Sequence, residues 1–147
     1  IAMSDWSSDV CSSDLKELLR GEQNGSISFG DYTLDKKAKL DNFEHGGDIY
    51  KVKTFYEITK LEKNGLFVYE SVPGSAVTGF TEKENGVSFQ VESNKDIQIT
   101  LELAESTEYA IYVDNEQVGL METNMSGKLS FSVELPMPPV NVKVVER

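Results

Sequence analysis

Strict alternation of apolar and polar residues is the feature that most constrains the fold of this 147-residue chain. Val87, Phe89 and Val91 alternate with polar residues. The same period of two runs through residues 97–103, 109–113, 129–135 and 140–144. A period of two places one face of each strand against a core and the other in water, as in antiparallel sheets packed face to face. The pattern predicts an all-β chain. Because the strands recur about every 8–12 residues, we predict an antiparallel β-sandwich, with an open barrel as the second choice.

Short turn signals separate the predicted strands. Asn64-Gly65 and Asn85-Gly86 are Asn-Gly pairs, and Asp114-Asn115 is a related pair. Asn-Gly supplies the positive φ angles of a type I′ turn, whose twist matches the flanking strands of a two-residue hairpin. We therefore predict one hairpin of residues 56–62 with 66–71, and a second of residues 77–82 with 87–92.

The N-terminal segment breaks this pattern. Residues 4–14 are mostly Ser and Asp, and residues 5–15 resemble a translated sequencing adapter. We therefore expect residues 1–15 to be an artefactual, disordered leader and residues 16–147 to be a single β-sandwich domain. Leucines at helical spacing ahead of Gly21 predict one short N-terminal helix over residues 15–20.

Charge argues against several classes of partner. The formal net charge is −11, and because the leader holds three aspartates and no cation, residues 16–147 carry about −8. This excess opposes binding to nucleic acid or to an anionic membrane, both of which need clustered Lys and Arg. Lys36, Lys37 and Lys39 form the only local basic cluster, which we interpret as a solvated turn or strand edge. No apolar run approaches the roughly 20 residues that span a bilayer, so we expect a cytoplasmic protein.

The sequence contains no recognisable catalytic or metal-binding motif. His45 is the only histidine, and it lies with Glu44 and Asp48 in a polar stretch that we expect to be a loop turned at Gly46-Gly47. The two-His spacing of a zinc site is missing and the only Cys lies in the leader, so we predict no metal and no cofactor. Because ligands commonly bind at loops on a rigid scaffold, Glu44, His45 and Asp48 are candidate binding residues. Tyr112 is the fourth candidate, since a tyrosine on the polar face of a strand can stack on a sugar ring.

Three stretches, residues 41–55, 66–74 and 127–135, carry a resemblance to a known family. Over nearly all of residues 16–147 the chain resembles short bacterial proteins labelled endosialidases. The resemblance implies a complete small protein rather than a fragment of a larger enzyme. The last third of the chain is also similar to small β-sandwich modules appended to polysaccharide-degrading enzymes.

These observations lead to a functional expectation. The arginine cluster that would hold a sialic carboxylate is missing, because residues 16–147 contain only Arg20 and Arg147. We therefore expect a non-catalytic β-sandwich that acts by binding, with carbohydrate or a second copy of the chain as its partner. We expect residues 140–145 to be a sheet edge that could pair with a second copy of the chain in a homo-oligomer, because they contain no proline to block the pairing. The alternative is a glycan-active hydrolase that uses carboxylates near Glu44 and Asp48.

Overall fold

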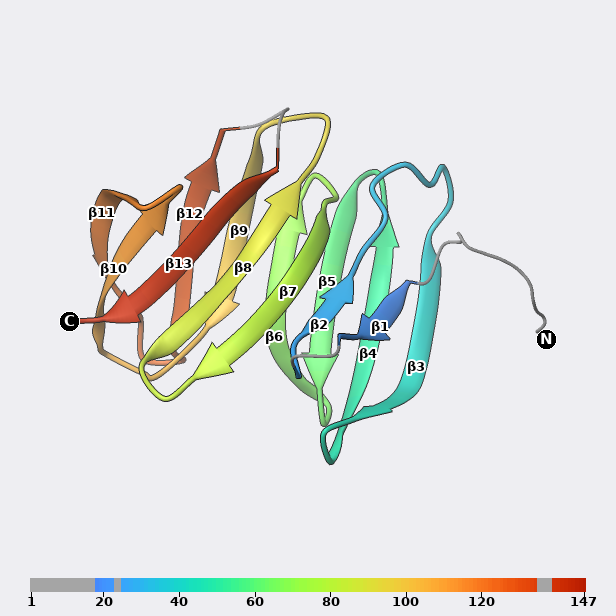
Figure 1. The fold of residues 1–147 in the computed structure, drawn as a ribbon, viewed down its shortest axis with the longest axis horizontal. Helices are drawn as coiled ribbons and strands as arrows, with labels where there is room; N and C mark the ends of the chain where they lie inside the picture. The colour runs from blue at the N-terminus through green and yellow to red at the C-terminus, as the bar shows by residue number, and fades with distance from the viewer. Residues whose placement is uncertain (1–17, 23–24, 135–138) are drawn as a thin grey trace.

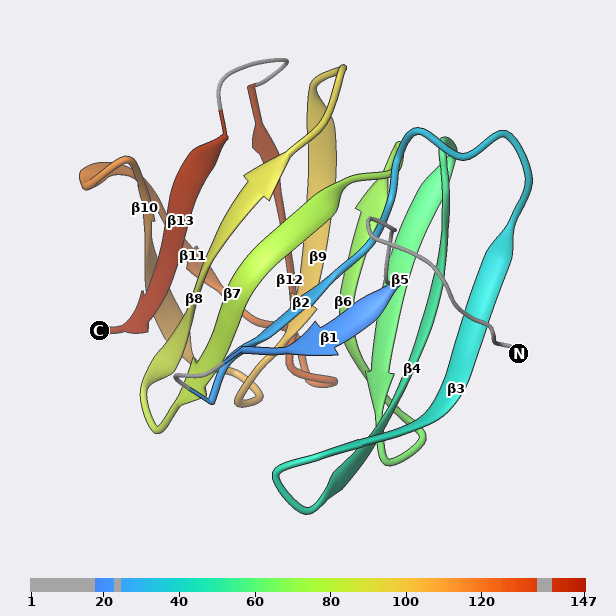
Figure 2. The ribbon, with the colours of Figure 1, turned by 45° about the vertical axis from the view of Figure 1, so that its right-hand side comes forward.

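The computed structural model describes residues 18–22, 25–134 and 139–147 of the chain. These residues form strands and no helix, so they include no helix that could cross a membrane. The strands make two antiparallel sheets that lie one over the other as two layers (Figures 1 and 2). The sheets do not close into a barrel, which confirms the predicted β-sandwich. The leader predicted at residues 1–15 lies outside the described residues.

The strand order shows how the chain is threaded through the two layers. The seven-stranded sheet has the order β1-β2-β7-β8-β13-β10-β11, and the six-stranded sheet has the order β12-β9-β6-β5-β4-β3. The first sheet consists of β1 (Leu19–Gly21), β2 (Ile27–Phe29), β7 (Ala76–Lys83), β8 (Gly86–Glu92), β13 (Val140–Glu146), β10 (Glu108–Val113) and β11 (Glu116–Glu122). The second consists of β12 (Lys128–Val133), β9 (Ile97–Glu102), β6 (Leu66–Val72), β5 (Ile58–Lys63), β4 (Asp48–Phe55) and β3 (Ala38–His45). The chain therefore passes between the layers repeatedly, and neighbours in a sheet are often distant in sequence.

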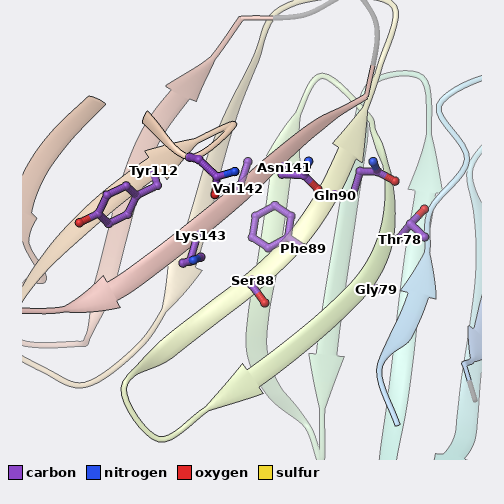
Figure 3. Close-up of a pocket in the computed structure, with 10 residues that line it drawn as sticks. Thr78, Gly79, Ser88, Phe89, Gln90, Tyr112, Asn141, Val142 and Lys143 are labelled. Atoms are coloured by element: carbon purple, nitrogen blue, oxygen red, sulfur yellow. The ribbon is translucent and has the colours of Figure 1, made fainter. Parts of the chain in front are cut away.

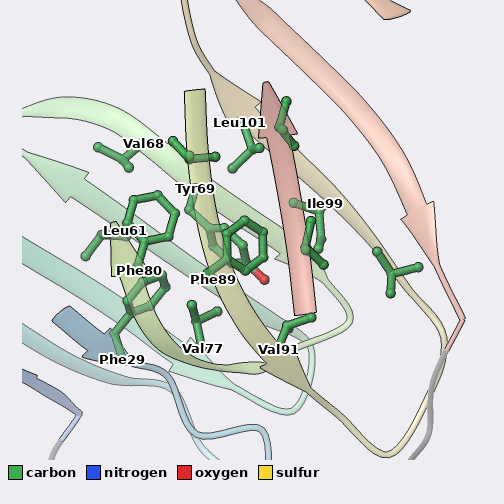
Figure 4. Close-up of a cluster of buried hydrophobic side chains, with 14 of the residues drawn as sticks. Phe29, Leu61, Val68, Tyr69, Val77, Phe80, Phe89, Val91, Ile99 and Leu101 are labelled. Atoms are coloured by element: carbon green, nitrogen blue, oxygen red, sulfur yellow. The ribbon is translucent and has the colours of Figure 1, made fainter. Parts of the chain in front are cut away.

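The hydrophobic core fills the space between the sheets, and an aromatic cluster lies within it (Figure 4). Tyr69 of β6 is fully buried and meets Phe29, Phe80 and Phe89 of the opposite sheet. The centroid distances from the Tyr69 ring are 5.2 Å to Phe29, 6.3 Å to Phe80 and 5.7 Å to Phe89, all edge-to-face. Edge-to-face contacts between aromatic rings add a favourable interaction energy to the energy gained from the area that the rings bury. Tyr69 therefore joins the two layers near the centre of the core.

Buried hydroxyl groups fix the crossing from β6 to β7. The Ser75 Oγ is hydrogen-bonded to the Tyr69 hydroxyl at 2.8 Å and to the Ser71 Oγ at 2.7 Å. The Thr59 Oγ1 accepts from the Ser75 N–H at 3.0 Å and donates to the Ser75 carbonyl at 2.9 Å. Burying these polar groups costs little because each has a partner.

Both predicted hairpins are present, as β5–β6 and β7–β8. Asn64 and Gly65, with φ angles of 53° and 81°, form the turn of the first, as the sequence predicts. In the second, Lys83 pairs with Gly86, so the turn is Glu84-Asn85 and lies one residue earlier than predicted. Gly86 is instead the first residue of β8, where its φ of 155° and the close approach of the Val144 carbonyl leave no room for a side chain.

The predicted N-terminal helix is wrong where it can be compared with the structure. Residues 15–17 lie outside the described residues, and Leu19–Gly21 form strand β1. Leu19 pairs with Phe29 of β2 and is buried in the core. A strand of three residues is too short to show a period of two, so the leucine spacing was misleading, and pairing with β2 determines the local structure.

The polar stretch around His45 is also not the loop that we predicted. Strand β3 ends at His45 and strand β4 begins at Asp48. Only Gly46 and Gly47 form the turn between them, with φ angles of 62° and 86°. A bulge between Leu40 and Phe43 interrupts the alternation of β3. The strand lies at the edge of its sheet, and all of its residues are partly or fully exposed. These two features explain why its sequence is typical of a loop.

Residues 140–145, which we predicted to form a sheet edge, lie in an interior strand instead. β13 is hydrogen-bonded to β8 on one side and to β10 on the other. The edges of the seven-stranded sheet are β1 and β11, and those of the six-stranded sheet are β12 and β3. On β11, the side chains of Val118 and Leu120 are 58% and 46% exposed. β11 therefore replaces residues 140–145 as the apolar edge of the described chain.

Candidate functional site

A hollow of about 430 Å³ lies on the outer face of the seven-stranded sheet, and we call it the Tyr112 groove (Figure 3). It is formed by four neighbouring strands, β7, β8, β13 and β10, and by the turn after β10. Its lining residues are Thr78, Gly79, Ser88, Phe89, Gln90, Tyr112, Asn115, Asn141, Val142 and Lys143. The lining contains no carboxylate and a single cation, although the chain as a whole carries a net charge of −11. The groove therefore differs in character from the acidic chain around it.

The pairing register builds this lining from two rows of side chains. Thr78 pairs with Gln90, and Gln90 pairs with Asn141. Two residues along the strands, Ser88 pairs with Lys143, and Lys143 pairs with Tyr112. Side chains at paired positions stand about 5 Å apart on the same face of an antiparallel sheet. The two rows thus form one polar surface, with the tyrosine ring at its β10 end (Figure 3).

Local backbone features shape the groove at its two ends. On β7, the register shifts between Thr78 and Thr81, and Gly79 within this bulge has a φ of 67° and no side chain to fill the space. At the other end, the Asp114 N–H donates to the Asn141 carbonyl at 2.8 Å, and the Asp114 carboxylate accepts from the Asn141 N–H at 3.0 Å. These bonds hold the turn after Tyr112 against β13. The groove therefore has a defined backbone frame.

The polar side chains of the groove are not used by the fold. Within the described residues, no hydrogen bond or ion pair engages the side chains of Gln90, Asn141, Tyr112 or Lys143. An amide offers both a donor and an acceptor, a hydroxyl offers both at one atom, and the tyrosine adds an apolar ring face. The groove can therefore bind a ligand that presents hydroxyl groups and apolar C–H surfaces.

The other three predicted binding residues lie far from Tyr112 in the fold, at the β3–β4 turn on the edge of the six-stranded sheet. His45 pairs with Asp48, whereas Glu44 pairs with the exposed Ile49. Because successive residues of a strand point to opposite faces, Glu44 lies on one face of the hairpin and the pair of His45 and Asp48 on the other. The structure therefore does not bring the four candidates together in one site.

His45 and Asp48 already have structural partners. The His45 Nε2 is hydrogen-bonded to the Gly25 carbonyl at 3.1 Å, and the imidazole packs so closely on Gly21 that an added Cβ there would lie 2.5 Å from its Nδ1. Asp48 accepts a hydrogen bond of 2.9 Å from the Asn64 side-chain amide. These contacts tie the β3–β4 hairpin to the neighbouring strands. The described residues contain no group of three or more His, Cys, Asp or Glu side chains placed to hold a metal ion.

The sequence suggested Tyr112 as a candidate binding residue but did not point to its neighbours in the groove. Gln90, Asn141 and Lys143 stand on strands that are far apart in the sequence and become neighbours only because β13 lies between β8 and β10. Their signal was the polar half of the alternation in β8 and β13, which marks an outward face without saying which strands share it. No protein-family model, curated protein or solved structure matches this chain.

Proposed function

We propose that this chain is a non-catalytic β-sandwich that binds carbohydrate in the Tyr112 groove. The observation that carries the proposal is the lining, in which a tyrosine ring lies beside amides and hydroxyls that have no partner within the described residues. A sugar has apolar C–H faces that suit the ring, and hydroxyl groups that match the amides of Gln90 and Asn141. The lining has no carboxylate and one lysine, so a neutral glycan is the ligand class that we propose.

Replacing Tyr112 with alanine is the direct test of this proposal. We expect the variant to bind a neutral oligosaccharide about tenfold more weakly, because a stacked aromatic ring contributes on the order of 1 kcal/mol in addition to its buried area. The ligand would be found on a glycan array and its dissociation constant measured by calorimetry. Tyr56→Ala is the matched control, since Tyr56 is 48% exposed and does not line the groove. Equal loss in both variants, or none in Tyr112→Ala, would contradict the proposal.

The alternative, a glycan-active hydrolase, has less support. Glycosidases place two carboxyl groups about 5–9.5 Å apart on either side of one bond. Glu44 and Asp48 both line a hollow of about 490 Å³ at the β3–β4 turn, but they project from opposite faces of the hairpin, and Asp48 accepts a hydrogen bond from the Asn64 side chain at 2.9 Å. The binding proposal would fail if the chain hydrolysed a glycan and Glu44→Gln together with Asp48→Asn removed that activity.

Self-association is the second candidate function, and strand β11 favours it. An edge strand leaves one row of backbone groups unpaired, and β11 also exposes Val118 and Leu120. We expect a concentration-dependent dimer in light scattering coupled to size-exclusion chromatography, and we expect Leu120→Lys to shift it to monomer by placing a charge at the contact. Ser132→Lys, on the edge strand of the other sheet, should leave the dimer intact. A dimer that persists in Leu120→Lys would exclude this edge.

A further inference from the structure

The outer face of the six-stranded sheet carries a concentration of positive charge that the sequence does not reveal. Lys39 of β3 pairs with Lys53 of β4, and Lys53 pairs with Lys60 of β5. Lys51 lies two residues before Lys53 on the same face of β4, and Lys37 precedes β3. We call these five residues the lysine surface. Figure 2 shows the three adjacent strands that bring them together.

The lysine surface is electrostatically unfavourable for the free protein. Like charges directly opposite each other on a sheet destabilise it. Lys53 lies at the centre: partial burial, followed by the charges of Lys37, Lys39, Lys60 and Lys51, lowers the pKa of its amino group. A sheet that needed only solubility would be more stable with charges of alternating sign here. The arrangement is therefore one that a bound anion would relieve.

The carboxylates on this face are fewer than its lysines and lie away from Lys39 and Lys53 in the pairing register. Glu62 is ion-paired with Lys60 at 3.6 Å and stands opposite Lys51, and Glu70 stands opposite Lys60 in the next strand. Glu44 lies on the same face of the sheet, opposite Ile49. Within the described residues, Lys39, Lys51 and Lys53 make no ion pair. Lys37 contacts the Phe55 ring at 5.8 Å. Among these described lysines only Lys60 makes an ion pair, and only Lys51 and Lys60 stand opposite a carboxylate.

A hollow of about 660 Å³ adjoins the lysine surface. Lys37 and Lys53 belong to both the lysine surface and the lining of the hollow, and Lys95 is a third cation in that lining. The apolar part of its lining is Phe55, Tyr56, Ile58, Val72 and Pro73, and Glu57 is its one carboxylate. The hollow therefore combines several cations with apolar lining residues, so that an anionic group and an adjoining organic body can both be accommodated.

We propose that the lysine surface and its hollow bind a compact ligand with clustered phosphate groups, either free or as a lipid headgroup. Lysine binds phosphate as a point charge, and several phosphates close together carry enough charge to neutralise a group of lysines. We propose a compact ligand because the chain as a whole has a net charge of −11, which repels an extended polyanion. At physiological salt, charges are screened beyond about 8 Å, so a small anion interacts mainly with the lysines, whereas a long nucleic acid also meets the acidic remainder of the chain.

Titration with inorganic tripolyphosphate tests this site in the intact chain. We expect saturable binding that weakens as salt is added, and an affinity about fivefold lower in Lys53→Gln, the effect of one lysine beside an anionic group. Lys83→Gln is the matched control, because Lys83 is exposed at the end of β7, outside the lysine surface. The Lys53→Gln variant should fold at least as well as the wild type, since it removes a repulsive charge. Absence of binding, or equal loss in both variants, would overturn the proposal.

Two further arms identify the source of the phosphate and test its compactness. Co-sedimentation with phosphatidylcholine vesicles containing phosphatidylinositol bisphosphate, reversed by tripolyphosphate, would assign a lipid headgroup. Tripolyphosphate binding without co-sedimentation would assign a free ligand. A double-stranded DNA oligomer should bind more weakly than tripolyphosphate at physiological salt. If the DNA bound more tightly and Lys53→Gln reduced that binding, the lysine surface would be a nucleic-acid site and the compact-ligand proposal would be wrong.

Discussion

Replacing Tyr69 with alanine is expected to lower the free energy of unfolding by about 4 kcal/mol, the largest loss that we foresee for a single side chain in this protein. The substitution removes a fully buried ring from between the sheets, together with its edge-to-face contacts to Phe29 and Phe89. It also takes one hydrogen-bond partner from the buried Ser75 hydroxyl. Urea unfolding followed by far-ultraviolet circular dichroism measures the change.

Two other tyrosine variants separate the contributions to this loss. Tyr69→Phe keeps the ring and removes only the hydroxyl bonded to Ser75, so we expect a loss of about 1–2 kcal/mol. Tyr56→Ala removes an exposed ring and should change the free energy of unfolding by less than about 0.5 kcal/mol. Equal losses in Tyr69→Ala and Tyr56→Ala would mean that Tyr69 does not lie in the core.

The pH dependence of the free energy of unfolding at alkaline pH gives an independent check on the burial of Tyr69. Burial raises the pKa of its hydroxyl to about 12, against the opposing effect of the hydrogen bonds with Ser75 and Ser71. The unfolded chain releases this proton near pH 10, so the stabilisation by the neutral hydroxyl is complete below pH 10 and is lost as the pH rises towards about 12. We therefore expect Tyr69→Phe to lose less stability than the wild type between these two pH values.

Replacing Gly86 with alanine is expected to cost about 3 kcal/mol or more, the second large effect. An added Cβ would lie 1.9 Å from the Val144 carbonyl oxygen, and the φ of 155° is one that L-residues rarely adopt. Backbone strain and overpacking each cost about 1–3 kcal/mol. Because the obstacle is backbone rather than a flexible side chain, β8 and β13 would have to separate there. The same urea unfolding experiment measures the loss.

Gly119→Ala is the matched control for this backbone effect. Gly119 also lies in a strand of the seven-stranded sheet, but it has no positive φ and no atom within 4 Å of an added Cβ. We expect its unfolding curve to overlay that of the wild type within about 0.5 kcal/mol. If Gly86→Ala were equally neutral, the close packing of Gly86 on β13 would be refuted.

The fold class could be predicted from the sequence because each central strand has one face in the core and one in water. β8 and β9 show this directly, since Val87, Phe89 and Val91 are buried, as are Ile97, Ile99 and Leu101. The prediction fails where this condition does not hold. β1 is three residues long, and β3 is an edge strand with a bulge, so neither has a full set of alternating positions.

The order of the strands in each sheet could not be predicted from the alternation pattern. Alternation tells which residues of a strand face outwards, but it does not tell which strand lies beside which. The Tyr112 groove depends on β13 lying beside both β8 and β10, and the lysine surface depends on the register of three strands. Tyr112 was found as a single residue, whereas Lys39, Lys53 and Lys60 are separated in sequence and become a group only through pairing.

The interior position of β13 also governs how this chain can be made. β8 and β10 are complete once residue 113 has been synthesised, but the strand that joins them does not begin until Val140. Until then the seven-stranded sheet is divided into two parts, each with an unpaired edge beside buried apolar residues. Such long-range closure is slow and leaves intermediates that aggregate. β13 therefore completes the sheet, and a chain that ended before Val140 would lack the strand that joins β8 to β10.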